Sequence, residues 1–234
     1  MLFNSPLSYQ KADQLIDVLN CSAVDRVLDV GCGTGEFLVR LIDESAASAL
    51  GIDMNPELIS EAQQKAAARL PNNSPIEFRA ADVQAEAIRE NSFDVAICIG
   101  STHAFGVGET AYPKALDQLS RWVKPSGQLL IGEGYWKQPP AQGYLDLLGD
   151  TPGIYHTHAE NVWLGERRGL TPLYTAVSNS DEWDHFEGLH WLRAEQKFAG
   201  DEERLQTIRA WRDGYLRWGR DTMGFGFYLF QNLV

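Results

Sequence analysis

The chain has 234 residues, of which 44% are hydrophobic and 22% are charged, and these proportions are typical of a globular domain with a full core. Its formal net charge of −12 disfavours a nucleic-acid partner, because phosphate contacts need basic patches. No apolar run approaches the roughly 18 residues of a membrane span, and no signal peptide is visible, so no membrane partner is expected. The three cysteines lack the spacing of metal ligands, and we expect free thiols, no metal site and a cytoplasmic location.

The N-terminal segment, residues 1–20, is predicted to hold an amphipathic helix over Ser8–Asn20. After it, the stretch Arg26–Phe37 reads RVLDVGCGTGEF, an apolar run with Asp29 inside it that breaks into alternating glycines. These glycines are Gly31, Gly33 and Gly35. The pattern predicts a buried strand, a tight turn and a helix over Glu36–Asp43, whose free N–H groups favour an anionic ligand.

Two acidic residues follow further along, each just after a predicted strand. The strand Ala47–Ile52 is followed by Asp53, at about the ~20-residue distance from the glycine loop at which doubly wound folds place a carboxylate on ribose hydroxyls. A helix is predicted over Pro56–Arg69, and a second strand over Ile76–Ala80 precedes Asp82-Val83. Both acids are therefore expected near a ligand at the carboxyl edge of a sheet.

The next predicted strand, Phe93–Ile99, is continuous and apolar, as a central parallel strand should be. It leads into the small polar loop Gly100–Gly106, which contains His103 and lies at the edge where open α/β sheets bind ligands. A helix over Tyr112–Val123, a Lys-Pro-Ser-Gly turn and a strand over Gln128–Glu133 follow.

This series of motifs resembles the class I S-adenosylmethionine (SAM)-dependent methyltransferase family, in its small-molecule, type 11/25-like branch. The resemblance covers residues 27–135 and includes the run LSRWVKPSGQLLIGEGYW. It implies a doubly wound α/β fold with a seven-stranded, mostly parallel sheet of order 3-2-1-4-5-7-6 and an antiparallel last strand. The dinucleotide fingerprint would instead require a glycine at the position of Glu36.

The resemblance also implies the residues that bind the cofactor. The glycine loop receives the methionine end of SAM, Asp53 accepts both ribose hydroxyls, and Asp82 accepts from the adenine amino group. Met54 and Val83 pack on the adenine ring. The complete predicted set is Asp29, Gly31, Gly33, Gly35, Asp53, Met54, Asp82, Val83, Ile99 and Gly100.

The second half of the chain matches the family in topology only. We expect one domain over residues 1–234, with a cofactor-binding core at 21–135, a helical lid or substrate region at 136–222 and a final strand within 223–234. The predicted elements of the lid region are helices over Gln142–Leu148, His158–Arg168, Glu182–Phe198 and Asp201–Gly219, and a strand over Leu173–Val177. The many aromatic residues here either pack the inserted helices or line an apolar pocket for a small substrate.

His103 is the best candidate for a general base acting on a methyl acceptor, although a histidine that stabilises its loop fits the pattern slightly better. Glu133, at a strand end, either holds a polar substrate group or bonds the neighbouring backbone. The weaker histidine candidates are His156, His158, His185 and His190.

The predicted function is transfer of a methyl group from SAM to a small-molecule acceptor, with S-adenosylhomocysteine (SAH) as the product and a monomer or homodimer as the assembly. A SAM-binding regulator without turnover is the first alternative, because binding and catalysis share the cofactor motifs. A nicotinamide-dependent dehydrogenase is the second, although it has no use for Asp82.

Overall fold

The computed structural model describes residues 3–233, so residues 1, 2 and 234 of the predicted terminal segments lie outside the described residues. A seven-stranded sheet of order β3-β2-β1-β4-β5-β7-β6 runs through the molecule. The strands are β1 (Arg26–Val30), β2 (Ser48–Asp53), β3 (Ile76–Ala80), β4 (Phe93–Ile99), β5 (Val123–Trp136), β6 (Leu170–Val177) and β7 (Met223–Asn232). Strand β7 is antiparallel to both of its neighbours, and the other pairs are parallel. The predicted strand order and antiparallel last strand are confirmed.

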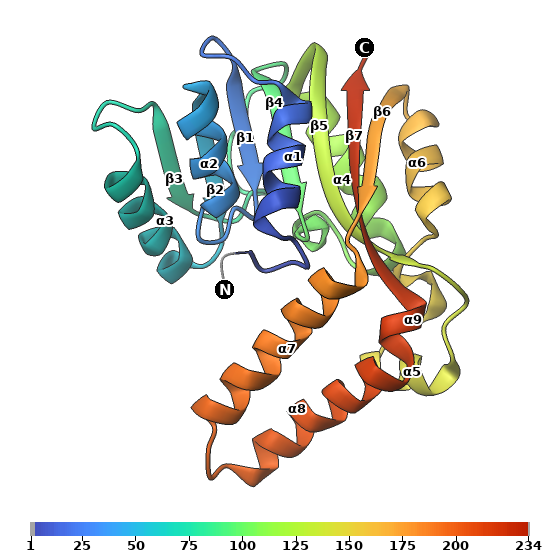
Figure 1. Cartoon of the computed structure of the whole chain (residues 1–234). Helices are drawn as coiled ribbons and strands as arrows, with labels where there is room; N and C mark the ends of the chain where they lie inside the picture. Colours follow the sequence, from blue (N-terminus) through green and yellow to red (C-terminus); the bar gives the residue numbers. More distant parts are fainter. Residues whose placement is uncertain (1–2, 234) are drawn as a thin grey trace.

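Helices cover both faces of this sheet (Figure 1). The helices on one face are α1 (Tyr9–Leu19), α2 (Glu36–Ser45) and α3 (Pro56–Arg69), and those on the other are α4 (Ala111–Trp122) and α6 (His158–Glu166). Neighbouring residues of β1 point to opposite faces of the sheet. Val27 packs in the hydrophobic core under α1, α2 and α3, and Leu28 packs in the core under α4 and α6. A sheet buried on both faces explains why its central strands are continuously apolar.

The remaining helices lie beyond the carboxyl ends of the parallel strands (Figure 1). They are α5 (Gln142–Leu148), α7 (Ser180–Lys197), α8 (Glu202–Gly214) and the short α9 (Arg220–Thr222). Glu182 fixes the start of α7, because it completes a capping box with Asn179 and forms a 2.5 Å ion pair with Lys11 of α1. Trp183 of α7 stacks on Tyr215, the residue directly after α8, with ring centroids 6.3 Å apart. This contact holds the start of α7 against the end of α8.

Most predicted elements form at or close to their predicted bounds, and two differ in extent. Strand β5 begins at Val123, although its register with β4 shifts before Gln128, at the predicted turn where Ser126 has φ of +67°. The predicted helix over Asp201–Gly219 is α8 followed by one π-helical turn, Tyr215–Gly219. Both differences come from backbone irregularities that apolar periodicity does not encode.

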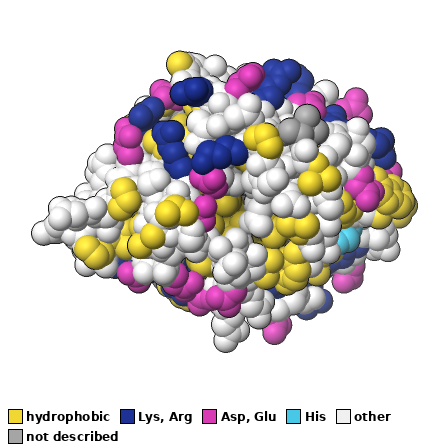
Figure 2. Space-filling model, turned by 90° about the horizontal axis from the view of Figure 1, so that it is seen from above, with side chains coloured by type: hydrophobic (Ala, Val, Ile, Leu, Met, Phe, Trp, Pro, Cys, Tyr) yellow, Lys and Arg dark blue, Asp and Glu magenta, His cyan; other side chains and the backbone are white. Residues whose placement is uncertain are grey.

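Figure 2 shows the opposite end of the molecule, at the amino ends of the parallel strands. Acidic, basic and apolar side chains are interspersed there, without one large field of a single sign. The cavities described below all lie elsewhere, at the carboxyl edge and under the added helices.

Candidate active site

A cavity of about 560 Å³ opens where β1, β2 and β4 end. This volume suits a cofactor-sized ligand. The cavity brings together seven of the predicted site residues: Asp29, Gly31, Gly33, Asp53, Ile99, Gly100 and His103. Residues far apart in the sequence therefore meet at one edge of the sheet, as the motifs predict.

The glycine loop leaves its backbone open toward this cavity. Gly31 has φ of +72°, and a Cβ there would lie 2.1 Å from Ser101 Oγ, so packing alone requires glycine. Gly33 has φ of +54°, but a Cβ there would meet nothing within 4 Å. At Gly33 the free space lies in front of the loop, which is the arrangement needed for close approach of a ligand to the backbone.

Two carboxylates stand beside the loop. Asp53 accepts the backbone N–H of Gly33 at 2.9 Å through Oδ2, and that of Asn55 at 2.9 Å through Oδ1. Asp29 is only 4% exposed, and burial, reinforced by the charge of Asp53, raises its pKa to about 7. The Asp53 carboxylate is thus held in a fixed orientation, while no cationic side chain within residues 3–233 pairs with Asp29.

Four predicted cofactor residues do not line this cavity. Gly35 begins α2, and a Cβ there would lie 2.8 Å from Ala62, so this glycine allows helix packing. Met54 is 71% exposed. Asp82 accepts the backbone N–H of Gln84, and Val83 is buried in the core cluster under α4. The adenine contacts inferred for Met54, Asp82 and Val83 therefore stay predictions.

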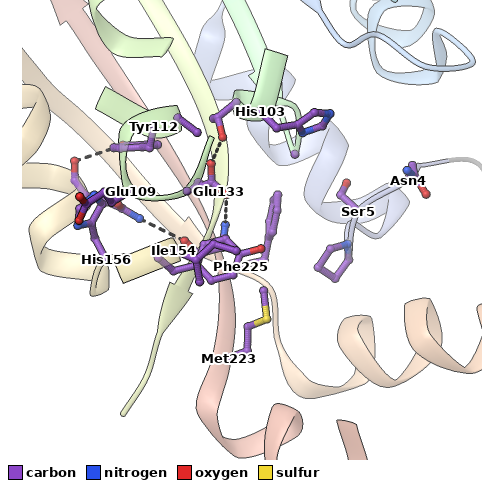
Figure 3. Close-up of a pocket in the computed structure, with 18 of the residues that line it drawn as sticks. Asn4, Ser5, His103, Glu109, Tyr112, Glu133, Ile154, His156, Met223 and Phe225 are labelled. Atoms are coloured by element: carbon purple, nitrogen blue, oxygen red, sulfur yellow. Dashed lines mark hydrogen bonds between the residues drawn. The ribbon is translucent and has the colours of Figure 1, made fainter. Parts of the chain in front are cut away.

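A second cavity, of about 250 Å³, adjoins the first and is drawn in Figure 3. Four residues line both cavities: Asn4, Ser5, Gly100 and His103. His103 lies on a single 3₁₀ turn, Thr102–Ala104, directly after β4. Among the described residues, His103 is therefore the titratable side chain that lines both cavities.

Glu133 of β5 faces the second cavity (Figure 3). It accepts a hydrogen bond from the hydroxyl of Thr102 and another, 2.8 Å long, from the backbone N–H of Gly134. The predicted bond to the neighbouring backbone is present, whereas the predicted contact of Glu133 with a polar substrate group stays a prediction. Burial raises the pKa of Glu133.

Helix α7 contributes side chains that the sequence motifs did not indicate. His190 and Arg193 line the first cavity, and Trp183 and Phe186 line the second. His190, one of the weaker base candidates, packs on Phe186 with ring centroids 4.7 Å apart. The contributions of Asn4, Ser5 and Asn161 were also missed, because no spacing rule connects them to the glycine loop.

Within residues 3–233, no group of three or more His, Cys, Asp or Glu side chains is arranged to hold a metal ion. The same residues include no helix that is both long and apolar enough to span a membrane.

A methyltransferase-domain family model matches residues 27–127. The chain is 30% identical over 203 residues to "Putative methyltransferase YqeM" of Bacillus subtilis, covering 82% of this chain and 77% of that protein. It is 25% identical over 236 residues to the uncharacterized protein YjhP of Escherichia coli, covering 96% and 92%.

Among solved structures, a SAM-dependent methyltransferase from Geobacter sulfurreducens in complex with SAH has a TM-score of 0.87 to this chain. The two are 23% identical, and the match covers 97% of this chain and 92% of that one. Together with the strand order and the glycine loop, these matches establish that the chain belongs to the class I SAM-dependent methyltransferase family.

Proposed function

We propose that the protein binds SAM in the first cavity and transfers its methyl group to a small molecule held in the second. The observation that carries this proposal is the shared boundary of the two cavities at Gly100 and His103. A methyl donor on one side of this boundary and a nucleophile on the other are within reach of in-line displacement, and such positioning supplies about 7–11 kcal/mol of a barrier.

The residues of the first cavity fit SAM. Gly33 leaves the loop backbone uncovered, and Asp53 presents a carboxylate that is already oriented by the loop. The predicted roles follow, with the loop at the methionine end and Asp53 on the ribose hydroxyls. The Asp53 carboxylate also supplies negative charge that suits a ligand carrying an ammonium and a sulfonium.

When bound, SAM supplies an electrophilic methyl group; the acceptor's lone pair forms the new bond to carbon, and the electron pair of the broken C–S bond remains on sulfur as SAH. His103 is positioned to take the proton that an O–H or N–H acceptor loses. A positioned base of this kind contributes about 10²–10⁴-fold to the rate.

The proposed division of the chain follows from the same geometry. Residues 21–135 provide the cofactor side, and residues 136–222 provide much of the wall of the second cavity, including His156, Asn161 and Trp183. We propose that α7 acts as part of a lid, because it lines both spaces. The free thiols Cys21, Cys32 and Cys98 support a cytoplasmic location.

Glu36 argues against a nicotinamide cofactor. It stands where the dinucleotide fingerprint needs its third glycine, and it is engaged by Lys65 at 2.9 Å and Arg69 at 2.8 Å. The third glycine of that fingerprint allows close packing of helix against strand, and Glu36 fills this position with a long side chain instead.

The test is calorimetric titration of the purified protein with SAM, SAH and NADH, followed by a metabolite screen for SAH release. We expect SAM and SAH to bind and at least one acceptor to release SAH. Binding of NADH without SAM would overturn the proposal in favour of the dehydrogenase. Binding of SAM with no SAH release from any compound would favour the regulator.

A further inference from the structure

The second cavity contains buried polar atoms that no group in the described part of the protein satisfies. These atoms are His156 Nε2, Asn161 Oδ1 and Trp183 Nε1. They come from three separate segments, which are the loop before α6, α6 itself and α7. Unsatisfied buried polar atoms cost free energy, and three of them around one cavity indicate a polar ligand that pairs with them.

The orientation of Asn161 is fixed by its other contacts. Its amide nitrogen donates to the hydroxyl of Tyr228 at 3.1 Å, while its backbone carbonyl accepts from the hydroxyl of Tyr112 at 3.2 Å. The nitrogen is therefore occupied, and the oxygen, on a residue that lines the cavity, has no hydrogen-bond donor among residues 3–233.

Glu133 adds a second acceptor with unused capacity. A carboxylate offers about four lone-pair sites, and the described bonds from Thr102 and Gly134 use one on each oxygen. No lysine or arginine lines this cavity among residues 3–233, so the described neighbours include no cation for Glu133. The carboxylate is buried, and a buried charge needs a counter-charge or a proton.

The walls beside these acceptors are aromatic. Tyr112, Tyr155, Trp183, Phe186 and Phe225 line the same space. Ring faces attract cations and pack against apolar carbon, whereas they offer nothing to a phosphate or carboxylate.

We infer that the methyl acceptor is a small organic amine, held in the second cavity by hydrogen bonds from its N–H groups to Glu133 and Asn161. This inference rests on the proposed function. His156, on the loop before α6, offers the bound amine a further polar contact. The indole N–H of Trp183 donates to an uncharged acceptor atom at the end of the ligand opposite its amino group. An amine supplies the donors that the cavity lacks and, when protonated, the missing positive charge. Anionic acceptors, including phosphorylated amines, are disfavoured, because within residues 3–233 the lining contains no lysine or arginine and its basic side chains are His103 and His156.

The test uses three probes of nearly the same size and shape: tyramine, the carboxylate 3-(4-hydroxyphenyl)propanoate and the uncharged 4-ethylphenol. Each is titrated into the wild-type protein saturated with SAH, and binding is followed by calorimetry and by the shift in melting temperature. Tyramine is expected to bind at least tenfold more tightly than either of the others. Equal or tighter binding of the carboxylate would overturn the inference.

Variants locate the effect. Glu133→Gln keeps the shape of the side chain and removes its charge, so the preference for tyramine over 4-ethylphenol should fall at least tenfold. The matched control is Glu203→Gln, an exposed carboxylate of α8 that lines neither cavity, which should leave the preference intact. An unchanged tyramine affinity in Glu133→Gln would contradict the assignment.

Titration with SAH distinguishes a failure of the proposed function from a failure of the amine inference. Glu133→Gln should bind SAH like the wild-type protein, which also shows that the variant is folded. If SAH fails to bind the wild-type protein, the proposed function is wrong. If SAH binds and the wild-type protein prefers the carboxylate, only the amine inference is wrong, and this comparison requires no variant to fold.

Discussion

Asp53 and Gly33 are joined by a 2.9 Å hydrogen bond, in which the carboxylate at the end of β2 accepts the N–H of the glycine loop after β1. One side chain thus orients the loop and presents its remaining lone pairs to the cavity. Asp53→Ala should weaken SAH binding at least tenfold, since hydrogen bonds to a charged group are worth about 1.5–3 kcal/mol. Calorimetric titration checks this, and Glu57→Ala, an exposed acid at the start of α3, should bind SAH normally.

Gly33→Ala tests the approach of the ligand to the loop. The added methyl group meets no protein atom within 4 Å, so the change costs only about 1 kcal/mol for the left-handed backbone, yet it places carbon where the ligand should lie. We expect a folded protein with SAH binding reduced at least tenfold. Gly149→Ala is the control, because this glycine also has a positive φ and open space but lies outside the cavity. Similar losses in both variants would mean that backbone strain, not ligand contact, explains Gly33.

Asp29 should make stability depend on pH. Its pKa is raised to about 7 by burial and by the charge of Asp53, so the folded protein holds a proton that the unfolded chain releases above about pH 4. The contribution of Asp29 to stability therefore falls as pH rises toward 7, by at most about 1.4 kcal/mol per pH unit.

Urea unfolding of the wild-type protein and Asp29→Asn between about pH 5.5 and 8 measures this contribution. The difference in unfolding free energy should shift in favour of the variant as pH rises and level off above pH 7. A difference that stays constant over the range would show that Asp29 is ionised throughout.

Glu36 is expected to be important for stability. It is 3% exposed and contacts Lys65, Arg69 and Arg40, and these partners lower its pKa despite its burial. Glu36→Ala should cost about 3 kcal/mol, because it removes the buried carboxylate that these partly exposed cationic groups share. In chemical denaturation, Glu77→Ala should cost less than about 1 kcal/mol, because Glu77 is 59% exposed in its pair with Arg79.

His103→Ala distinguishes a base from a structural histidine. If His103 removes the acceptor's proton, kcat should fall about 10²–10⁴-fold while SAH affinity changes little. His103→Gln should be equally slow, since glutamine can hydrogen-bond but does not accept a proton at neutral pH. Turnover that is unchanged at saturating substrate would leave the loop-stabilising interpretation.

The fold could be predicted from sequence where burial on both faces made the strands continuously apolar. Helix α3 and strands β3 and β4 have their predicted bounds, and Gly31 and Gly33 indicated the turn that the structure requires. These elements could be predicted because burial in a parallel strand and a positive φ angle each restrict strongly which residue types can occupy a position.

The second cavity could not be predicted in the same way. Asn161 and Trp183 belong to helices whose sequences show only that they are helical, and they meet Glu133 through the packing of distant segments. Periodicity does not report which polar atoms of such helices stay unsatisfied, because that depends on the tertiary neighbours.

The antiparallel strand β7 has a consequence for how this scaffold can diverge. Helices α7 and α8 leave the sheet at the end of β6 and return at the start of β7, so both attachment points lie at the same rim. The segment between β6 and β7 can therefore change in length or conformation without disturbing the hydrogen bonds between the strands. Acceptor preference can therefore be redesigned by grafting this one segment, provided that the graft keeps His190 and Arg193, which line the first cavity.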